Sequence, residues 1–296
     1  MKILVIGSKG FIGSHVFDFY KKAGLEVIGC DVVTDYESDN YIQIDATNSD
    51  FHSIFEHNKV DVCVNCSGAA SVPQSLENPY RDYVLNTVNV FKLLDGIRQY
   101  QPQCKFLNLS SAAIYGNPES LPIREDAVSN PLSPYGLHKM QSEQICKEFF
   151  DYYNIKTCSV RIFSAYGAGL KKQLFWDMHQ KFVNDETIYL FGTGNETRDF
   201  IYISDVVNAI HCIIKNGAFG NEIINVANGE EYTIEYVANT FKKLLHSNKN
   251  ILFNKKIKPG DPFNWQADIS LITSMGYTPS VMLEEGISKY IQWLKG

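Results

Sequence analysis

Short apolar runs alternate with amphipathic segments through the first half of the 296-residue chain. The apolar runs predict β-strands, because each is short, nearly continuous and bounded by glycine or polar residues. They cover residues 3–6, 27–31, 60–66, 106–110 and 157–163. Between them, apolar residues at helical spacing predict helices over 12–23, 81–98 and 135–152. Strands buried on both faces belong to parallel sheets, so this alternation predicts a doubly wound α/β fold.

The pattern changes after residue 163, where glycine and polar residues become more frequent. The second half predicts strands near 188–191, 200–203 and 223–226 and helices near 175–184, 236–245 and 284–294. We therefore expect a smaller carboxy-terminal α/β domain that is interleaved with the first. In this prediction the larger domain comprises residues 1–164 and about 199–226, and the smaller one comprises about 165–198 and 227–296.

Composition narrows the class of protein. Hydrophobic residues make up 45% of the chain, which is enough to bury a core and excludes an intrinsically disordered protein. The net charge is −6 without a basic block, which argues against a nucleic-acid partner bound through its phosphates. The histidines and cysteines have no zinc-ligand spacing, so we expect no metal. Cys63 and Cys66 lie on a predicted strand, where an odd offset places the two thiols on opposite faces rather than in a redox motif.

The chain contains no apolar run long enough to span a membrane, so we expect no membrane partner. The apolar stretch at residues 1–7 is too short for a signal peptide and leads into a glycine loop, which makes it a first strand. These features predict a cytoplasmic protein.

A glycine-rich loop follows the first strand. Gly7, Gly10 and Gly13 form a G-x-x-G-x-x-G pattern, and the helix begins within it. Such glycines allow a tight turn and let a pyrophosphate approach the free N–H groups of the helix. Asp31 ends the second strand, where a carboxylate would bind ribose hydroxyls and repel a 2′-phosphate, so the pattern favours NAD over NADP. Asp45 follows a short β run and would either bind the adenine amine or remain a solvated loop aspartate.

Three residues suggest the chemistry. Tyr135 and Lys139 are four residues apart at the start of a predicted helix, so phenol and ammonium lie on one face. A neighbouring cation stabilises the phenolate, and we expect it to lower the tyrosine pKa from about 10 toward the working pH. Ser111 ends the predicted strand 106–110 and can hydrogen-bond the same substrate oxygen. This set can move a proton at a sugar hydroxyl or a ketone.

With these motifs, the chain resembles the extended short-chain dehydrogenase/reductases that act on nucleotide sugars. The resemblance covers essentially the whole chain and rests on segments 7–13, 66–70, 110–116, 161–167 and 192–202, together with Tyr135, Lys139 and Asp205. It implies a Rossmann-type NAD domain, a catalytic Ser/Tyr/Lys triad, a carboxy-terminal lobe that binds a nucleoside diphosphate sugar, and a homodimer.

The resemblance also implies a set of site residues. The cofactor would contact Gly7, Gly10, Phe11, Ile12, Gly13, Asp31, Asp45, Ala46, Ser67, Gly68, Ala69, Asn86, Tyr135 and Lys139. The substrate would contact Ser111, Ser164, Gln173, Arg198 and Lys258. Arg198 matches the residue that clamps the diphosphate, and its simplest alternative role is a structural pair with Asp199 or another carboxylate. Lys258 stands where the family commonly has a second arginine, and Ser164 replaces an asparagine of the family motif.

One departure from the family narrows the reaction. Ala112 and Ala113 occupy the positions at which nucleotide-sugar 4,6-dehydratases carry an Asp-Glu pair, so dehydration is not expected. The leading hypothesis is a UDP-glucose 4-epimerase-like enzyme that passes through a 4-keto sugar, and Asp31 favours it because retained NAD suits an epimerase. The alternatives are a 4-ketoreductase acting on a 4-keto-6-deoxysugar and, more distantly, a non-catalytic NAD-binding sensor. The sensor is disfavoured because Tyr135 and Lys139 are both present.

Overall fold

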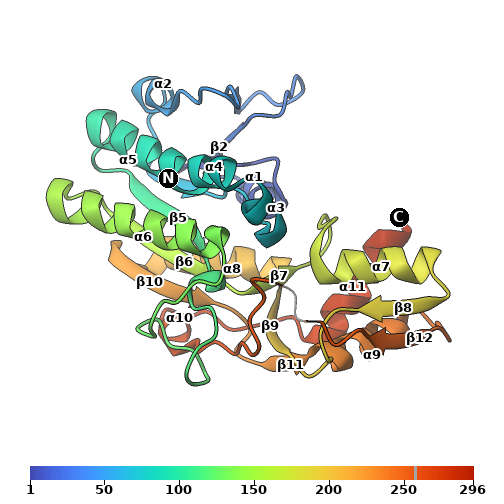
Figure 1. The fold of residues 1–296 in the computed structure, drawn as a ribbon. Coiled ribbons are helices and arrows are strands. Elements are labelled where there is room, and N and C mark those ends of the chain that lie inside the picture. The colour runs from blue at the N-terminus through green and yellow to red at the C-terminus, as the bar shows by residue number, and fades with distance from the viewer. Residues whose placement is uncertain (257–258) are drawn as a thin grey trace.

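A large parallel sheet forms the centre of the protein. The computed structural model describes residues 1–256 and 259–296. Within that part, seven parallel strands pair in the order β10-β6-β5-β4-β1-β2-β3. Their bounds are Lys2–Ile6 (β1), Glu26–Asp31 (β2), Tyr41–Gln43 (β3), Val62–Asn65 (β4), Lys105–Ser111 (β5), Thr157–Ile162 (β6) and Gly220–Val226 (β10). The doubly wound parallel sheet predicted from the sequence is confirmed (Figure 1).

Helices cover both faces of this sheet. The alternation of side chains along β1 sends Leu4 and Ile6 into one hydrophobic cluster and Ile3 and Val5 into another. The Leu4 cluster includes side chains of α2 (Phe51–His57), α5 (Asn89–Tyr100) and α6 (Pro134–Tyr153). The Ile3 cluster includes side chains of α1 (Phe11–Lys22) and α8 (Ile203–Asn216). This two-sided burial explains why the strands have nearly continuous apolar sequences.

The predicted helix over 81–98 is made of three consecutive segments. These are α4 (Pro79–Tyr83), a π-helical turn η1 (Val84–Val88) and α5. They follow the short helix α3 (Val72–Glu77). A π turn accommodates an additional residue and is frequent at functional sites. Here it carries Asn86 and Thr87, both of which are buried.

A smaller part of the protein is built on two further sheets. One has the strand order β11-β9-β7, and the other pairs β12 with β8. The strands are Ser164–Tyr166 (β7), Thr187–Leu190 (β8), Thr197–Tyr202 (β9), Glu231–Thr233 (β11) and Asn250–Phe253 (β12). The helices are Gln173–Asn184 (α7), Ile234–Leu244 (α9), Ser270–Ser274 (α10) and Leu283–Lys295 (α11).

Strands β9 and β10 belong to different sheets, although the sequence analysis grouped residues 199–226 with the large domain. Strand β10 pairs with β6 in the large sheet, whereas β9 pairs with β7 and β11. An apolar run identifies a buried strand but does not identify its pairing partner. The division of the chain into two domains stays a prediction.

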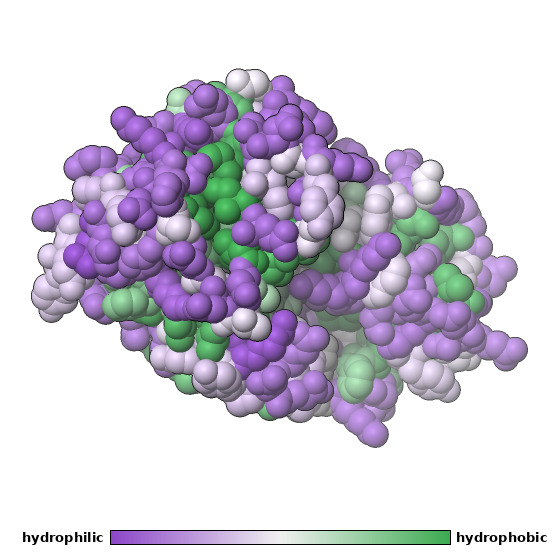
Figure 2. All heavy atoms as spheres, turned by 90° about the horizontal axis from the view of Figure 1, so that it is seen from above, coloured by the Kyte–Doolittle hydropathy of each residue, from purple (hydrophilic) through white to green (hydrophobic). Residues whose placement is uncertain are grey.

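One hydrophobic cluster connects the large and small parts. It contains Val5 and Val160 of the large sheet together with Phe175 of α7 and Tyr290 of α11. Seen from above, the surface is hollowed between the larger and the smaller part (Figure 2). Among the residues described, no helix combines the length and apolarity needed to cross a bilayer.

Candidate active site

The glycine loop joins β1 to α1 and lies tightly against the end of β4. Gly7 has a φ of +80°, and a Cβ on this residue would lie 2.8 Å from the backbone nitrogen of Ser67. A Cβ on Gly13 would overlap the carbonyl oxygen of Gly7. Both positions therefore require glycine, the first for its backbone conformation and the second for close packing.

The first turn of α1 leaves its backbone N–H groups available. Gly10 immediately precedes the helix and supplies no side-chain cap, and Phe11 and Ile12 are the first helical residues. This turn also contains no acidic residue. Free N–H groups at a helix amino terminus attract phosphate, so the loop fits the pyrophosphate of a dinucleotide.

Asp31 lies beside the glycine loop. Its carboxylate accepts hydrogen bonds from the backbone nitrogens of Lys9, at 2.8 Å, and Val32, at 2.7 Å. These two bonds fix the carboxylate at the carboxyl end of β2, where a ribose would lie.

Asp45 has a different environment. It lies with Ala46 in an exposed loop, and its carboxylate accepts hydrogen bonds from the backbone nitrogen and hydroxyl of Thr47. These hydrogen bonds hold the pKa of Asp45 below its usual value, and the bond from the Thr47 side chain has the largest effect. The local bonds support the alternative of a solvated loop aspartate.

The loop after β4 faces Asn86 and leaves polar groups without partners. Gly68 has a φ of +118°, and a Cβ there would overlap Oδ1 of Asn86 and lie 3.4 Å from Nζ of Lys139. Ser67 and Ala69, on either side of Gly68, are partly exposed. Both amide atoms of Asn86 are buried without a hydrogen-bond partner among the residues described. Buried polar groups normally have partners, so these atoms are available to a ligand.

Ser111, Tyr135 and Lys139 converge from β5 and α6. Ser111 ends β5, and its side chain lowers the pKa of the Tyr135 hydroxyl. Tyr135 lies in the first turn of α6, where Ser133 caps the helix by accepting from the backbone nitrogen of Gly136, at 3.2 Å. Lys139 lies one turn later, and its Nζ donates to the carbonyl oxygen of Leu109 at 2.8 Å. The structure thus brings the three predicted residues together.

The charge balance at these residues differs from the expectation. Burial raises the pKa of Tyr135, the side chain of Ser111 lowers it, and the charge of Asp82 raises it further. Burial also lowers the pKa of Lys139 to about 8. The pKa of Tyr135 is therefore raised in this structure, and the predicted fall toward the working pH is wrong. Burial disfavours the phenolate and the ammonium alike, and its effect is the largest at both residues.

A chain of buried side chains connects the cofactor loop to α6. Ser67 donates to Oδ1 of Asn65 at 2.6 Å, and Asn65 donates to Oδ1 of Asn108 at 3.2 Å. Asn108 then donates to Ser142 at 3.1 Å, and Ser142 donates to the carbonyl oxygen of Lys139 at 2.7 Å. Sequence reasoning missed this network. Its signal was an asparagine inside each of two otherwise apolar strands.

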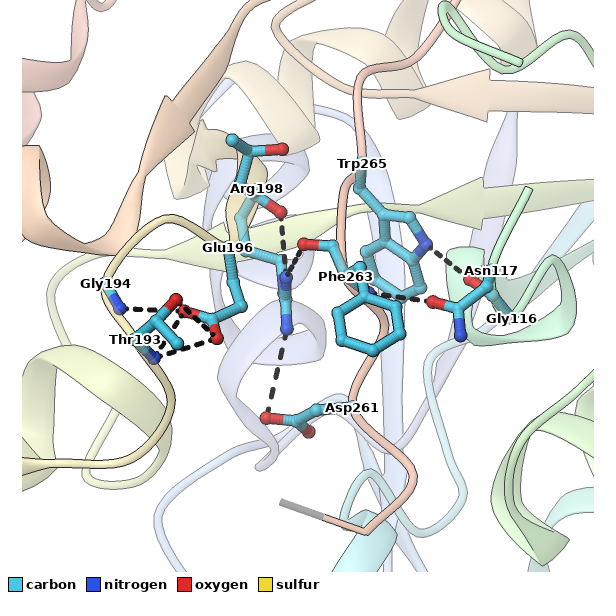
Figure 3. Close-up of polar contacts among 10 residues, drawn as sticks. Gly116, Asn117, Thr193, Gly194, Glu196, Arg198, Asp261, Phe263 and Trp265 are labelled. Atoms are coloured by element: carbon cyan, nitrogen blue, oxygen red, sulfur yellow. Dashed lines mark hydrogen bonds and ion pairs between the residues drawn. The ribbon is translucent and has the colours of Figure 1, made fainter. Parts of the chain in front are cut away.

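Arg198 forms a second polar centre in the small part of the protein (Figure 3). Its Nη1 donates to the carbonyl oxygens of Thr197, at 2.8 Å, and Phe263, at 3.2 Å. Its Nη2 lies 3.9 Å from the carboxylate of Asp261, and the guanidinium lies 5.7 Å from the ring centre of Trp265. The side chain is only 13% exposed, and burial lowers its pKa.

Arg198 does not form the suggested pair with Asp199. The Asp199 carboxylate accepts three backbone hydrogen bonds, from Asn228, Gly229 and Ala267. The partner of Arg198 is Asp261, at a distance that leaves the ion pair loose. Sequence reasoning did not identify Asp261 or Trp265, because both are distant from Arg198 along the chain.

The other predicted substrate residues differ in their exposure to solvent. Ser164 begins β7 and is partly buried, and Gln173 begins α7 with an exposed side chain. Lys258 lies outside the described residues. Within the described ranges, no three histidine, cysteine or carboxylate side chains are grouped to hold a metal.

Known proteins resemble this chain over its full length. The model of the NAD dependent epimerase/dehydratase family matches residues 3–227. A Methanocaldococcus jannaschii protein provisionally named UDP-glucose 4-epimerase is 30% identical, over 99% of this chain and 98% of that protein.

Solved structures agree with this relationship. The Thermotoga maritima UDP-glucose 4-epimerase with UDP-glucose has a TM-score of 0.91 at 28% identity, over 100% of this chain and 99% of that one. The Bacillus cereus UDP-glucuronic acid 4-epimerase with UDP-glucuronic acid and NAD has a TM-score of 0.91 at 26% identity, with the same coverage. Together with the family match, these similarities show that the chain belongs to the NAD-dependent epimerase/dehydratase family.

Proposed function

We propose that this protein is a nucleotide-sugar 4-epimerase that uses NAD. The observation that carries the proposal is the convergence of Ser111, Tyr135 and Lys139 at the sheet edge where the glycine loop also lies. The loop, Ser67 and Ser111 follow the carboxyl ends of β1, β4 and β5, and ligands bind at this edge of parallel sheets. The C4 epimerases of Methanocaldococcus, Thermotoga and Bacillus support the choice of reaction.

The residues present fit NAD. The amide of Asn86 and the buried hydroxyl of Ser8 have no hydrogen-bond partner in the described part of the chain and can bind a ligand. The glycine loop offers backbone N–H groups. We expect the cofactor to be held by Gly7, Gly10, Phe11, Ile12, Gly13, Asp31, Ser67, Gly68, Ala69, Asn86, Tyr135 and Lys139. Bound NAD supplies reversible hydride transfer at the sugar carbon.

The chain's own residues manage the proton. The Tyr135 oxygen takes the proton of the C4 hydroxyl when the sugar is oxidised to the 4-keto form. After the keto sugar has turned and is reduced from its opposite face, Tyr135 returns the proton to the same C4 oxygen. Ser111 donates a hydrogen bond to the same substrate oxygen. Lys139 is fixed by Leu109 and by the polar network at its own carbonyl, so its ammonium stays beside the reacting groups.

The substrate diphosphate would be bound by Arg198. This guanidinium is mostly buried. Among the described residues its partners are two carbonyl oxygens and a loose ion pair, so a second anion finds free donors. Ser164 and Gln173 would contact the sugar or the base. Ser111 would then bind the sugar, and Arg198 would bind the diphosphate attached to it.

The test begins with the purified protein. Denaturation should release NAD, and a panel of UDP-glucose, UDP-glucuronate and their N-acetylated counterparts should yield C4 epimers by NMR without added reductant. Stoichiometric consumption of NADH by a 4-keto-6-deoxysugar, without epimerisation, would identify a 4-ketoreductase instead. Cofactor release without turnover of any substrate would support the sensor.

Asp31 should control the choice of cofactor. Asp31→Ala removes the carboxylate that repels a 2′-phosphate, so we expect the preference for NAD over NADP to narrow by about tenfold or more. Titration of both cofactors into the cofactor-free wild type and variant measures the ratio. Asp45→Ala is the matched control, because this carboxylate bonds its own loop and should leave the ratio unchanged.

A homodimer would cover an exposed aromatic face. Tyr80 of α4, Phe91 of α5 and Tyr152 and Tyr153 of α6 are exposed, and Phe91 and Tyr153 both pack against Phe149. Large exposed apolar patches commonly mark protein interfaces. We expect Phe91→Glu to yield a monomer in light scattering, whereas Tyr189→Glu, at an exposed position of β8, should not change the mass. A cytoplasmic location is proposed as well, and it fits the seven free thiols.

A further inference from the structure

A buried acid–histidine pair lies beside the candidate active site. Nδ1 of His138, on α6, lies 2.6 Å from Oδ1 of Asp82, on α4. Asp82 is 2% exposed and His138 is 8% exposed. The pair therefore bridges two helices in a part of the protein from which water is excluded.

The pair holds the turn of α6 that carries the reacting groups. His138 immediately precedes Lys139 and follows Tyr135 by three residues. Its ring packs edge-on against Tyr83, with the ring centres 5.3 Å apart. Thr87 of the π turn donates to the His138 carbonyl oxygen at 3.2 Å. These contacts fix His138 from α4 and from η1.

Burial of Asp82 has a cost in free energy, because one of its carboxylate oxygens lacks a partner in the described part of the chain. Its Oδ2 is buried and has no hydrogen-bond partner among the residues described. A buried carboxylate oxygen without a partner loses its hydration without compensation. Packing alone would be served as well by a neutral or apolar side chain. The charge itself is therefore the feature that needs an explanation.

We propose that Asp82 and His138 are positioning residues. His138 holds the α6 turn that bears Tyr135 and Lys139, and Asp82 sets the pH at which Tyr135 exchanges its proton. This inference rests on the proposed function, in which Tyr135 moves the proton of the substrate.

The electrostatic surroundings support this role. The negative charge of Asp82 raises the pKa of both Tyr135 and Lys139, which are otherwise affected chiefly by burial. The remaining groups that raise the Lys139 pKa are Cys66, Glu143 and Cys146. Glu143 is already held by Arg161, at 2.7 Å, and both thiols have their pKa raised to about 12 by burial. Asp82 is thus the carboxylate whose charge reaches both reacting groups without an arginine partner in the described chain.

The test compares pH profiles of kcat. Asp82→Asn keeps the shape and an acceptor for His138 but removes the charge, so the phenolate becomes easier to form. We expect the acid-side midpoint to fall by about half a pH unit or more, with bound NAD and the KM for the nucleotide sugar near wild type. Asp82→Glu retains the charge and should restore the midpoint, even if turnover is lower. Asp151→Asn, at an exposed position of α6, is the control and should leave the profile unchanged.

The failures are distinguishable. An unchanged midpoint in folded Asp82→Asn overturns the inference, and so does an equal shift in Asp151→Asn. Should Asp82→Asn fail to fold, Asp82→Ser, which is also uncharged, is measured with the same expectation. Wild-type turnover in Tyr135→Phe would instead overturn the proposed function on which the inference rests.

Discussion

Tyr135→Phe should lower turnover by about two to four orders of magnitude, because no other residue of the triad can replace its hydroxyl in proton transfer. Tyr135 is partly buried at the start of α6, and the side chain of Ser111 lowers the pKa of its hydroxyl. Phenylalanine keeps the ring and its packing. Folding and NAD content should therefore stay near wild type, and the loss should appear in kcat rather than in KM.

Two measurements check this prediction. Single-turnover assays of C4 epimerisation report the rate, and the cofactor released on denaturation reports NAD binding. Tyr115→Phe is the matched control, since its hydroxyl donates to Asn225 at 2.7 Å within the core. That variant should have a lower melting temperature but a kcat near wild type. Full activity in Tyr135→Phe would place the proton-transfer group elsewhere.

Local sequence patterns predicted the parts of the site that local geometry determines. The glycine loop was predictable because a strand, a tight turn and a helix follow one another within a few residues. Tyr135 and Lys139 were predictable because a helix places residues four apart on one face. Ser111 was predictable from its position at the end of a strand.

Features that depend on pairing between distant segments were not predictable in this way. Asp261 and Trp265 meet Arg198 only because the chain returns to β9 from the region near residue 263. The sheet to which β9 belongs also depends on distant partners. The direction of the Tyr135 pKa depends on burial, which the spacing of tyrosine and lysine does not report.

The buried asparagines were predictable in part. An asparagine inside an apolar strand signals that a polar partner must exist, because an unpaired buried amide is costly. The sequence does not name that partner. In the structure it is Asn108 for Asn65 and Ser142 for Asn108, and the network ends at the Lys139 carbonyl. Scanning strands for such residues would have found both asparagines but not Ser142, which lies on α6.

Arg198→Ala should weaken binding of the nucleotide sugar by roughly tenfold to more than a hundredfold. The variant loses a charge-assisted contact to the diphosphate, for which about 1.5–3 kcal/mol is typical. NAD content should stay near wild type, because we expect the cofactor's phosphates to bind at the glycine loop. The melting temperature should fall somewhat, since Arg198 also bonds the carbonyl oxygens of Thr197 and Phe263.

A matched variant separates the two roles of Arg198. Asn117 accepts a hydrogen bond from the backbone nitrogen of Phe263 at 2.8 Å, so Asn117→Ala loosens the same segment without removing a charge (Figure 3). Calorimetric titration with UDP and with the nucleotide sugar compares the variants. If Arg198 binds the diphosphate, only Arg198→Ala loses affinity for both ligands, and its deficit shrinks as salt screens the charge. An equal loss in Asn117→Ala would make Arg198 a structural residue of this segment, and the diphosphate would then have to be bound by another cation.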